Sequence, residues 1–149
     1  MRVALPLLGM ILNGALPVVP VTLPSGKVVL AEVARSDPER AEGLWHRRQL
    51  DWDHGMLFVF ERPGHHPFWM PPDIALRLDI IFLDPDGRIL HVEDNLGPCQ
   101  TPGNCPQYGV PISPPQQDRT QYVLEVNSGY AKKAGLKPGD RLLWPRNPA

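Results

Sequence analysis

Proline is the residue that most restricts what this chain can fold into. It occupies nineteen of 149 positions. Because proline lacks a backbone N–H and its ring clashes with the preceding helical turn, it is excluded from helix interiors and from central strands. We therefore expect short elements joined by many turns, and we exclude a bundle of long helices. The length is that of one domain, which is large enough to bury a hydrophobic core.

The overall charge argues against a nucleic-acid partner. Fifteen basic and sixteen acidic residues leave a formal net charge of -1, which creates no field that would gather a polyanion. Hydrophobic residues make up 42% of the chain and charged residues 21%, values typical of a globular protein.

The amino terminus has the layout of a secretory signal peptide. One positive side chain, Arg2, precedes a ten-residue apolar run that ends before the small residues Gly14 and Ala15. The run is too short for a stable transmembrane helix, which needs about 20 apolar residues. The alternative interpretation is a buried first strand. We expect residues 1–15 to be a signal peptide and residues 16–149 to form one compact domain in the periplasm or outside the cell.

Strand patterns dominate the rest of the chain. Ser36, with Glu39 three residues later, predicts a capping box and a short helix that ends at Gly43. A second short helix is expected over residues 128–134, and a long proline-rich loop over about residues 93–118. The fold class is therefore mainly β (α+β): a compact antiparallel sheet or a small barrel-like domain with two short helices. Strands are expected at residues 27–34, 55–60, 68–70, 121–126 and 141–144, and as a hairpin over residues 77–92 around Asp84-Pro85-Asp86-Gly87.

An ordered set of motifs resembles one known family. They are E-V-A-R, P-E-R-A-x-G-L, G-M-L-F-V-F, F-W-M, L-D-I-I-F-L-D-x-D-G, a cysteine pair, Y-V-L-E-V-N-x-G and G-L-K-x-G-D. The resemblance is to domain-of-unknown-function family 192 and covers about residues 28–142. It implies a compact, mainly β domain with short helices that is often exported, and it implies no activity. The family usually continues Trp-Met with Lys-Asn-Thr, whereas this chain has Pro71-Pro72-Asp73.

Cys99 and Cys105 are the only cysteines and lie in a proline- and glycine-rich stretch. Structural zinc sites favour two to four intervening residues and thioredoxin-like pairs two, so the five residues here weaken both interpretations. In an exported chain the two thiols would oxidise. We therefore favour a structural disulfide over metal ligands or free catalytic thiols, and we expect no metal and no cofactor.

Two carboxylates interrupt otherwise apolar strands. Asp79 lies within R-L-D-I-I-F-L-D and Glu125 within Q-Y-V-L-E-V. If both faced one cleft they could act as general acid and base, as in glycosidases, whose two carboxyl groups lie about 5 to 9.5 Å apart. Alternatively, each is half-buried and paired or hydrogen-bonded, because a buried carboxylate is otherwise costly.

These patterns predict a binding or accessory module without catalytic residues. Its ligand surface would be formed by Phe68, Trp69 and the cysteine loop and oriented by Asp79 and Glu125. The partner would be an unknown small ligand or an extracytoplasmic protein. The alternative is an extracytoplasmic hydrolase that uses Asp79 and Glu125. The sequence contains no nucleophile elbow, phosphate-binding glycine loop or dinucleotide fingerprint, which favours the binding module.

Overall fold

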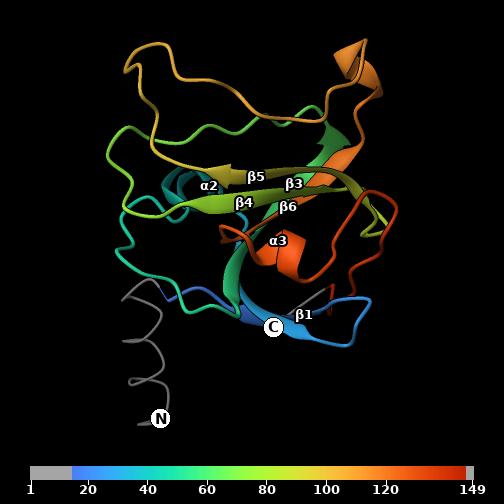
Figure 1. The fold of residues 1–149 in the computed structure, drawn as a ribbon. Coiled ribbons are helices and arrows are strands. Elements are labelled where there is room, and N and C mark those ends of the chain that lie inside the picture. The colour runs from blue at the N-terminus through green and yellow to red at the C-terminus, as the bar shows by residue number, and fades with distance from the viewer. Residues whose placement is uncertain (1–14, 147–149) are drawn as a thin grey trace, which may run out of the picture.

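The fold is built on one open β-sheet. A computed structural model of the protein describes residues 15–146. Six strands within this range lie in the order β1-β2-β3-β6-β4-β5 (Figure 1). All neighbouring pairs are antiparallel except β2 and β3. The predicted antiparallel sheet with two short helices is confirmed, and the sheet does not close into a barrel. The strands are β1 (Val18–Thr22), β2 (Val28–Ala34), β3 (His54–Gly64), β4 (Leu78–Leu83), β5 (Ile89–Leu96) and β6 (Thr120–Asn127).

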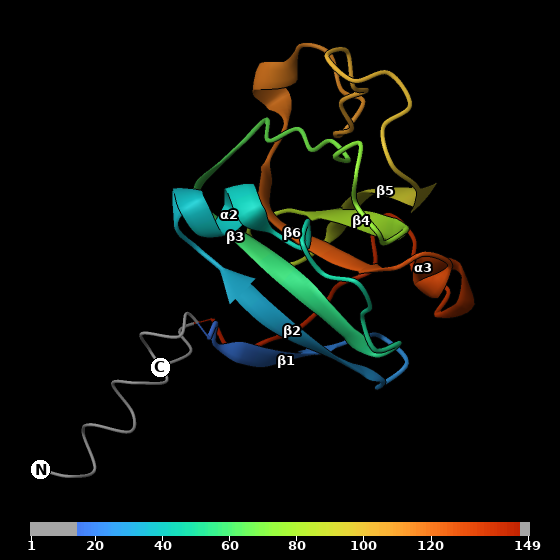
Figure 2. The same ribbon diagram turned by 90° about the vertical axis from the view of Figure 1, so that its left-hand side faces the viewer.

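Helix α2 (Asp37–Glu42) lies in the crossover between the parallel strands β2 and β3 (Figure 2). The predicted capping box is present: the Ser36 hydroxyl accepts from the Glu39 N–H, and the Glu39 carboxylate accepts from the Ser36 N–H. Gly43 ends the helix with a φ of 49°. A Cβ at this position would lie 3.2 Å from the Phe58 ring, so glycine lets the end of the helix approach the sheet closely.

Strand alternation divides the core between the two faces of the sheet. β4 is buried along its whole length, because each face is covered. One face packs against helix α3 (Tyr130–Lys133) and the carboxyl-terminal segment. The other face packs against Leu44, which follows α2, and against residues 70–76, which lead into β4. Buried residues on the first face include Val21, Leu57, Ile81, Leu124, Val126, Tyr130 and Leu142, and those on the second include Leu44, Met56, Phe58, Met70, Ile80, Phe82 and Val123.

Two predicted strands are wrong. Residues 68–70 form no strand: Phe68 makes an isolated bridge to Tyr108, and Trp69 is 57% exposed. Pro67 and Pro71 flank this segment and supply no N–H, so a longer ladder cannot form. Residues 141–144 likewise form isolated bridges only. The structure instead adds β1, which the sequence analysis did not predict.

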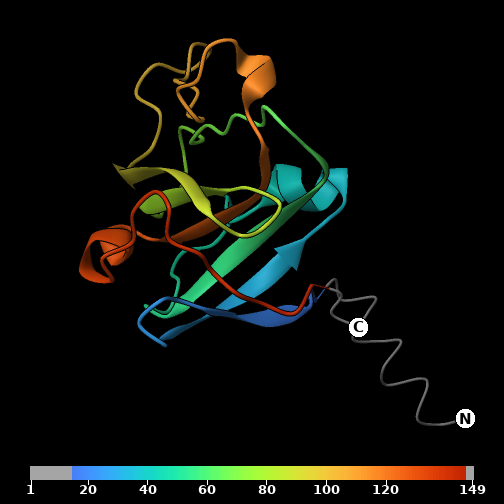
Figure 3. The same cartoon turned by 90° about the vertical axis from the view of Figure 1, so that its right-hand side faces the viewer.

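The long proline-rich loop lies over one end of the sheet, beside the segment that leads into β4 (Figure 3). It begins at Gly97, because β5 continues to Leu96, and it contains the short 3-10 helix η1 (Pro115–Gln117). The predicted signal peptide falls almost entirely on residues 1–14, which lie outside the described residues. Over residues 15–146, no helix combines the length and hydropathy needed to span a bilayer.

Candidate functional site: an apolar pocket with one acid

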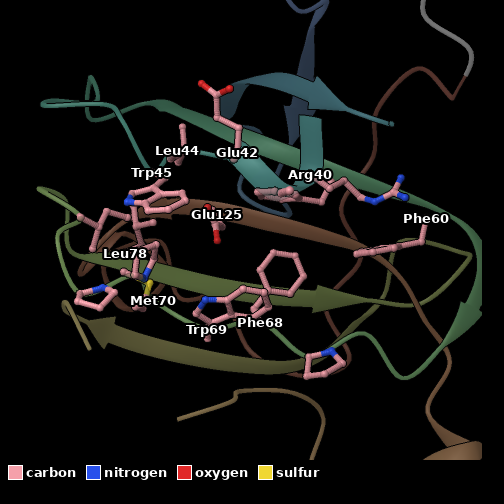
Figure 4. A pocket seen from close by; sticks show the side chains of 17 residues that line it. Arg40, Glu42, Leu44, Trp45, Phe60, Phe68, Trp69, Met70, Leu78 and Glu125 are labelled. Carbon is pink, nitrogen blue, oxygen red and sulfur yellow. The ribbon is translucent and has the colours of Figure 1, made fainter. Parts of the chain in front are cut away.

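A pocket of about 360 Å³ opens on one face of the sheet. Its walls come from α2 and the turn after it, from residues 67–74, and from β3, β4 and β6 (Figure 4). Most of the lining is aromatic, aliphatic or proline. The residues that line it are Arg40, Ala41, Glu42, Gly43, Leu44, Trp45, Phe58, Phe60, Pro67, Phe68, Trp69, Met70, Pro71, Pro72, Ile74, Leu78 and Glu125.

Glu125 supplies the carboxyl group inside this pocket. It lies on β6 between Met56 of β3 and Ile80 of β4, and its side chain points into the hollow between Trp45 and Phe68 (Figure 4). The residue is 6% exposed, and burial raises the pKa of its carboxyl to about 8. No side-chain hydrogen bond or ion pair joins this carboxyl to another of the described residues. Its oxygens are not fully enclosed, because every fully buried side-chain nitrogen and oxygen of the described residues has a hydrogen-bond partner. At neutral pH the group is therefore mainly a protonated acid that faces the pocket.

The aromatic walls are held in fixed orientations. The Trp45 indole N–H donates to the Asp73 carboxylate at 2.7 Å. The Phe68 ring makes edge contacts with Phe58, at 4.9 Å between ring centroids, and with Phe82, at 6.0 Å. Such edge-to-face pairs favour one geometry over others. The pocket is thus preformed around Glu125 on these sides.

The proline-rich loop braces the outer wall of the pocket. The Phe68 N–H donates to the Tyr108 carbonyl at 2.8 Å, and the Tyr108 N–H donates back at 2.7 Å. The Cys99 N–H donates to the Pro71 carbonyl at 3.3 Å. Cys99 and Cys105 lie at disulfide distance, with Cα atoms 5.5 Å apart, as the sequence analysis favoured. The cysteine pair therefore tightens the loop beside the segment that carries Trp69.

The charged groups at the pocket rim do not pair with Glu125. The Arg40 guanidinium lies 4.9 Å from the Phe60 ring centroid and donates to the Val59 carbonyl at 2.8 Å. It also pairs with Asp37, whose side chain is exposed. Glu42 is likewise exposed to solvent. The acid at the centre of the pocket has no counter-ion on the rim.

Asp79 lies on the other face of the sheet. In the register of β4 and β6, Asp79 is opposite Val126, whereas Ile80 is opposite Glu125. The Asp79 carboxylate is fully buried and accepts from the N–H groups of Asn95 at 2.8 Å, Gly129 at 3.2 Å and Ala131 at 2.9 Å. Neighbouring residues on a strand point to opposite faces. The acid–base pair considered for a hydrolase is therefore not assembled, and Asp79 instead holds the end of β5 to the start of α3.

Of the four candidate binding residues, the structure brings Phe68, Trp69 and Glu125 together at one pocket. Sequence reasoning missed the contribution of Trp45. Its signal was an aromatic residue two positions after Gly43, the glycine that ends a capped helix, but nothing local indicates that this turn faces Glu125. No three histidine, cysteine or carboxylate side chains between residues 15 and 146 lie close enough together to hold a metal ion.

His65 and Asp118 form a polar pair where the proline-rich loop enters β6. His65 Nδ1 lies 2.9 Å from Asp118 Oδ2, and Asp118 is 4% exposed. The other oxygen of Asp118 accepts from the Thr120 hydroxyl at 2.7 Å and from the Thr120 N–H at 3.0 Å. This cluster fixes the point at which the loop enters β6.

Comparison with known proteins places the chain in a family. The family model for domain of unknown function 192, described as "Uncharacterized ACR", matches residues 21–144. The chain therefore belongs to this family, whose description assigns no activity. No curated protein matches the chain at a significant level.

Two solved structures share the fold. One is a protein of unknown function from Novosphingobium aromaticivorans, with 35% sequence identity and a TM-score of 0.69 over 85% of this chain and 84% of that one. The other comes from Sinorhizobium meliloti and is described as a candidate transcription regulator. It has 32% identity and a TM-score of 0.68 over 85% of this chain and 92% of that one.

Proposed function

We propose that this protein is an exported binding module that holds a small, largely apolar ligand in the Glu125 pocket. The observation that carries the proposal is the buried, unpartnered carboxyl at the centre of a preformed apolar hollow. Small-molecule sites have this composition: apolar and aromatic walls with few polar groups that orient the ligand.

The energetic cost of Glu125 supports a ligand rather than a purely structural role. An acid whose pKa is about 8 in the folded state and near 4.5 in the unfolded chain lowers the free energy of unfolding by about 3 kcal/mol at pH 7. Leucine or methionine at this position would carry no such cost. Costly polar groups of this kind concentrate at functional sites.

Export is supported by the cysteine pair and by the sequence of the first 15 residues. Disulfides persist in oxidising compartments and are rare in the cytosol of most organisms. Intact-mass measurement of protein recovered from its native host would test export; a soluble pool that begins at Met1 would contradict it.

The hydrolase alternative loses its basis, because its two carboxylates lie on opposite faces of the sheet.

Binding can be tested by screening a library of small aromatic and aliphatic compounds against isotopically labelled protein. Ligands should shift the indole N–H resonances of Trp45 and Trp69 and the amide of Glu125. The matched variants are Trp69→Ala and Trp52→Ala, both of which remove a half-exposed indole. Only Trp69→Ala should weaken binding, because Trp52 lies outside this pocket. A screen in which no compound shifts these resonances at millimolar concentration would overturn the proposal.

A further inference from the structure

The Glu125 pocket combines a single buried acid with aromatic walls. The carboxyl is 6% exposed and has no protein partner over residues 15–146. Trp45, Phe68 and Trp69 line the space into which it points (Figure 4). Buried polar groups in native proteins nearly always have a hydrogen-bonding partner. A partner for this carboxyl, either water or a ligand, therefore enters through the pocket that the side chain faces.

We infer that the ligand is an organic ammonium ion, a primary to quaternary amine with a small apolar substituent, which binds between the aromatic rings and the Glu125 carboxylate. This inference rests on the proposed binding function and names its ligand class. A cation supplies the counter-charge that the carboxylate lacks, and the low exposure of Glu125 strengthens their attraction. Tryptophan and phenylalanine faces attract the same cation, and recognition of quaternary ammonium groups by aromatic side chains uses this attraction.

The other charged groups of the pocket lining do not neutralise Glu125, so its carboxylate is free to bind an ammonium ion. From α2, Arg40 and Glu42 line the pocket, and the lining residues from β3, β4 and residues 67–74 are uncharged. The Arg40 guanidinium is engaged by Phe60, the Val59 carbonyl and Asp37. The Glu42 side chain is 68% exposed, so its charge is screened by water. The described part of the pocket thus has no other group that would neutralise an ionised Glu125.

The pH dependence distinguishes an ammonium ion from an uncharged ligand. The pKa of Glu125 is raised to about 8, so the carboxyl is mostly protonated below that pH. A cation binds the ionised form and releases the proton. As the pH is raised toward 8, the affinity for the cation should therefore increase by up to tenfold per pH unit. Above pH 8 it should level off. A neutral ligand that accepts a hydrogen bond from the protonated acid would show the opposite trend, with affinity lost above pH 8.

The test compares two probes of the same shape: choline and its uncharged carbon isostere 3,3-dimethylbutan-1-ol. Both are titrated into the labelled protein at pH 6.5, 7.5 and 8.5, with the Trp45, Trp69 and Glu125 resonances as the readout. At pH 8.5 choline should bind at least tenfold more tightly than the isostere. Its affinity should fall nearly tenfold between pH 7.5 and 6.5, with uptake of choline releasing close to one proton in calorimetry at the lower pH.

Two charge-removing variants complete the experiment. Glu125→Gln should bring the affinities of the two probes to within about twofold. Glu61→Gln removes an exposed carboxylate of β3 that lies outside the pocket lining, and it should keep the preference. A thermal melt of each variant confirms that it is folded.

The outcomes separate the two proposals. Equal affinities in the wild type at pH 8.5, or a preference that survives Glu125→Gln, would overturn the ammonium assignment and leave the binding pocket standing. Isostere binding that is lost above pH 8 would assign a neutral hydrogen-bond acceptor instead. If neither probe shifts any pocket resonance at millimolar concentration, the ammonium assignment fails, and the library screen decides the binding proposal separately.

Discussion

Asp79 and Glu125 lie on opposite faces of the sheet, although their strands are neighbours and Glu125 is directly across from Ile80. The two acids consequently have opposite environments. Asp79 accepts three backbone N–H groups in the core, whereas Glu125 has no partner among the described residues and faces a pocket. Substitution of each acid by its amide should therefore change stability in opposite directions.

Asp79→Asn should destabilise the protein by about 1–3 kcal/mol. The amide replaces one acceptor oxygen with an N–H₂ group, which would face a backbone donor such as the Ala131 N–H. Urea denaturation at pH 7 measures the change in the free energy of unfolding. Asp86→Asn, in the exposed hairpin turn, is the matched control and should be close to neutral. An Asp79→Asn protein as stable as the wild type would contradict the structural role assigned to Asp79.

Glu125→Gln should stabilise the protein by about 3 kcal/mol at pH 7. The pKa of Glu125 is raised by burial to about 8, so folding is penalised wherever the unfolded chain would ionise this group and the folded chain does not. The penalty begins near pH 4.5 and grows through pH 8. The advantage of the variant should therefore increase by about 1.4 kcal/mol per pH unit between pH 5 and pH 8.

Denaturation of Glu125→Gln and wild type at pH 5, 6, 7 and 8 checks this slope. Glu42→Gln, whose side chain is exposed, should show no comparable pH dependence relative to wild type. A stability difference between Glu125→Gln and wild type that stays constant with pH would show that Glu125 has an ordinary carboxyl pKa.

Replacement of both Cys99 and Cys105 by serine should lower stability by up to about 2 kcal/mol and leave the sheet intact. The loop would be less ordered, and the hydrogen bond from the Cys99 N–H to Pro71 would weaken. Hydrogen exchange should show faster exchange at Tyr108 and Phe68, whose amides pair the loop with the pocket wall. Thiol titration of unfolded, unreduced wild-type protein should find no free cysteine, and two reactive thiols would refute the pairing.

Pro71→Lys should place an ammonium group in the protein's own pocket. Pro71 lines the pocket together with Glu125, so a lysine here would extend from the pocket wall. We expect the pKa of Glu125 to fall and the affinity for choline to drop by at least tenfold. Pro71→Gln, which removes the proline without adding charge, is the control. If both variants bind choline equally well, the lysine does not reach Glu125.

Local chemistry accounts for much of what the sequence predicted. The Ser36–Glu39 capping box depends on residues three apart, and the β4–β5 hairpin turns at Asp84 and Gly87 because an aspartate and a glycine suit those positions. These interactions need no other part of the chain. They therefore define where helices, strands and turns form before any tertiary contact is considered.

The pocket is a consequence of tertiary structure. Alternation shows which residues of one strand share a face, but it does not show which face of the next strand joins them, because that depends on register. The β4–β6 register separates Asp79 from Glu125, and the β2–α2–β3 crossover brings Trp45 across the sheet to Glu125, 80 positions later in the chain. The proline-flanked segment 67–74 forms the opposite wall, and the loop pairs with it at Phe68 and Pro71. The sequence by itself determined the capped helix, the hairpin and most of the strands. Tertiary packing decided which side chains meet, because contacts between distant residues depend on register and docking.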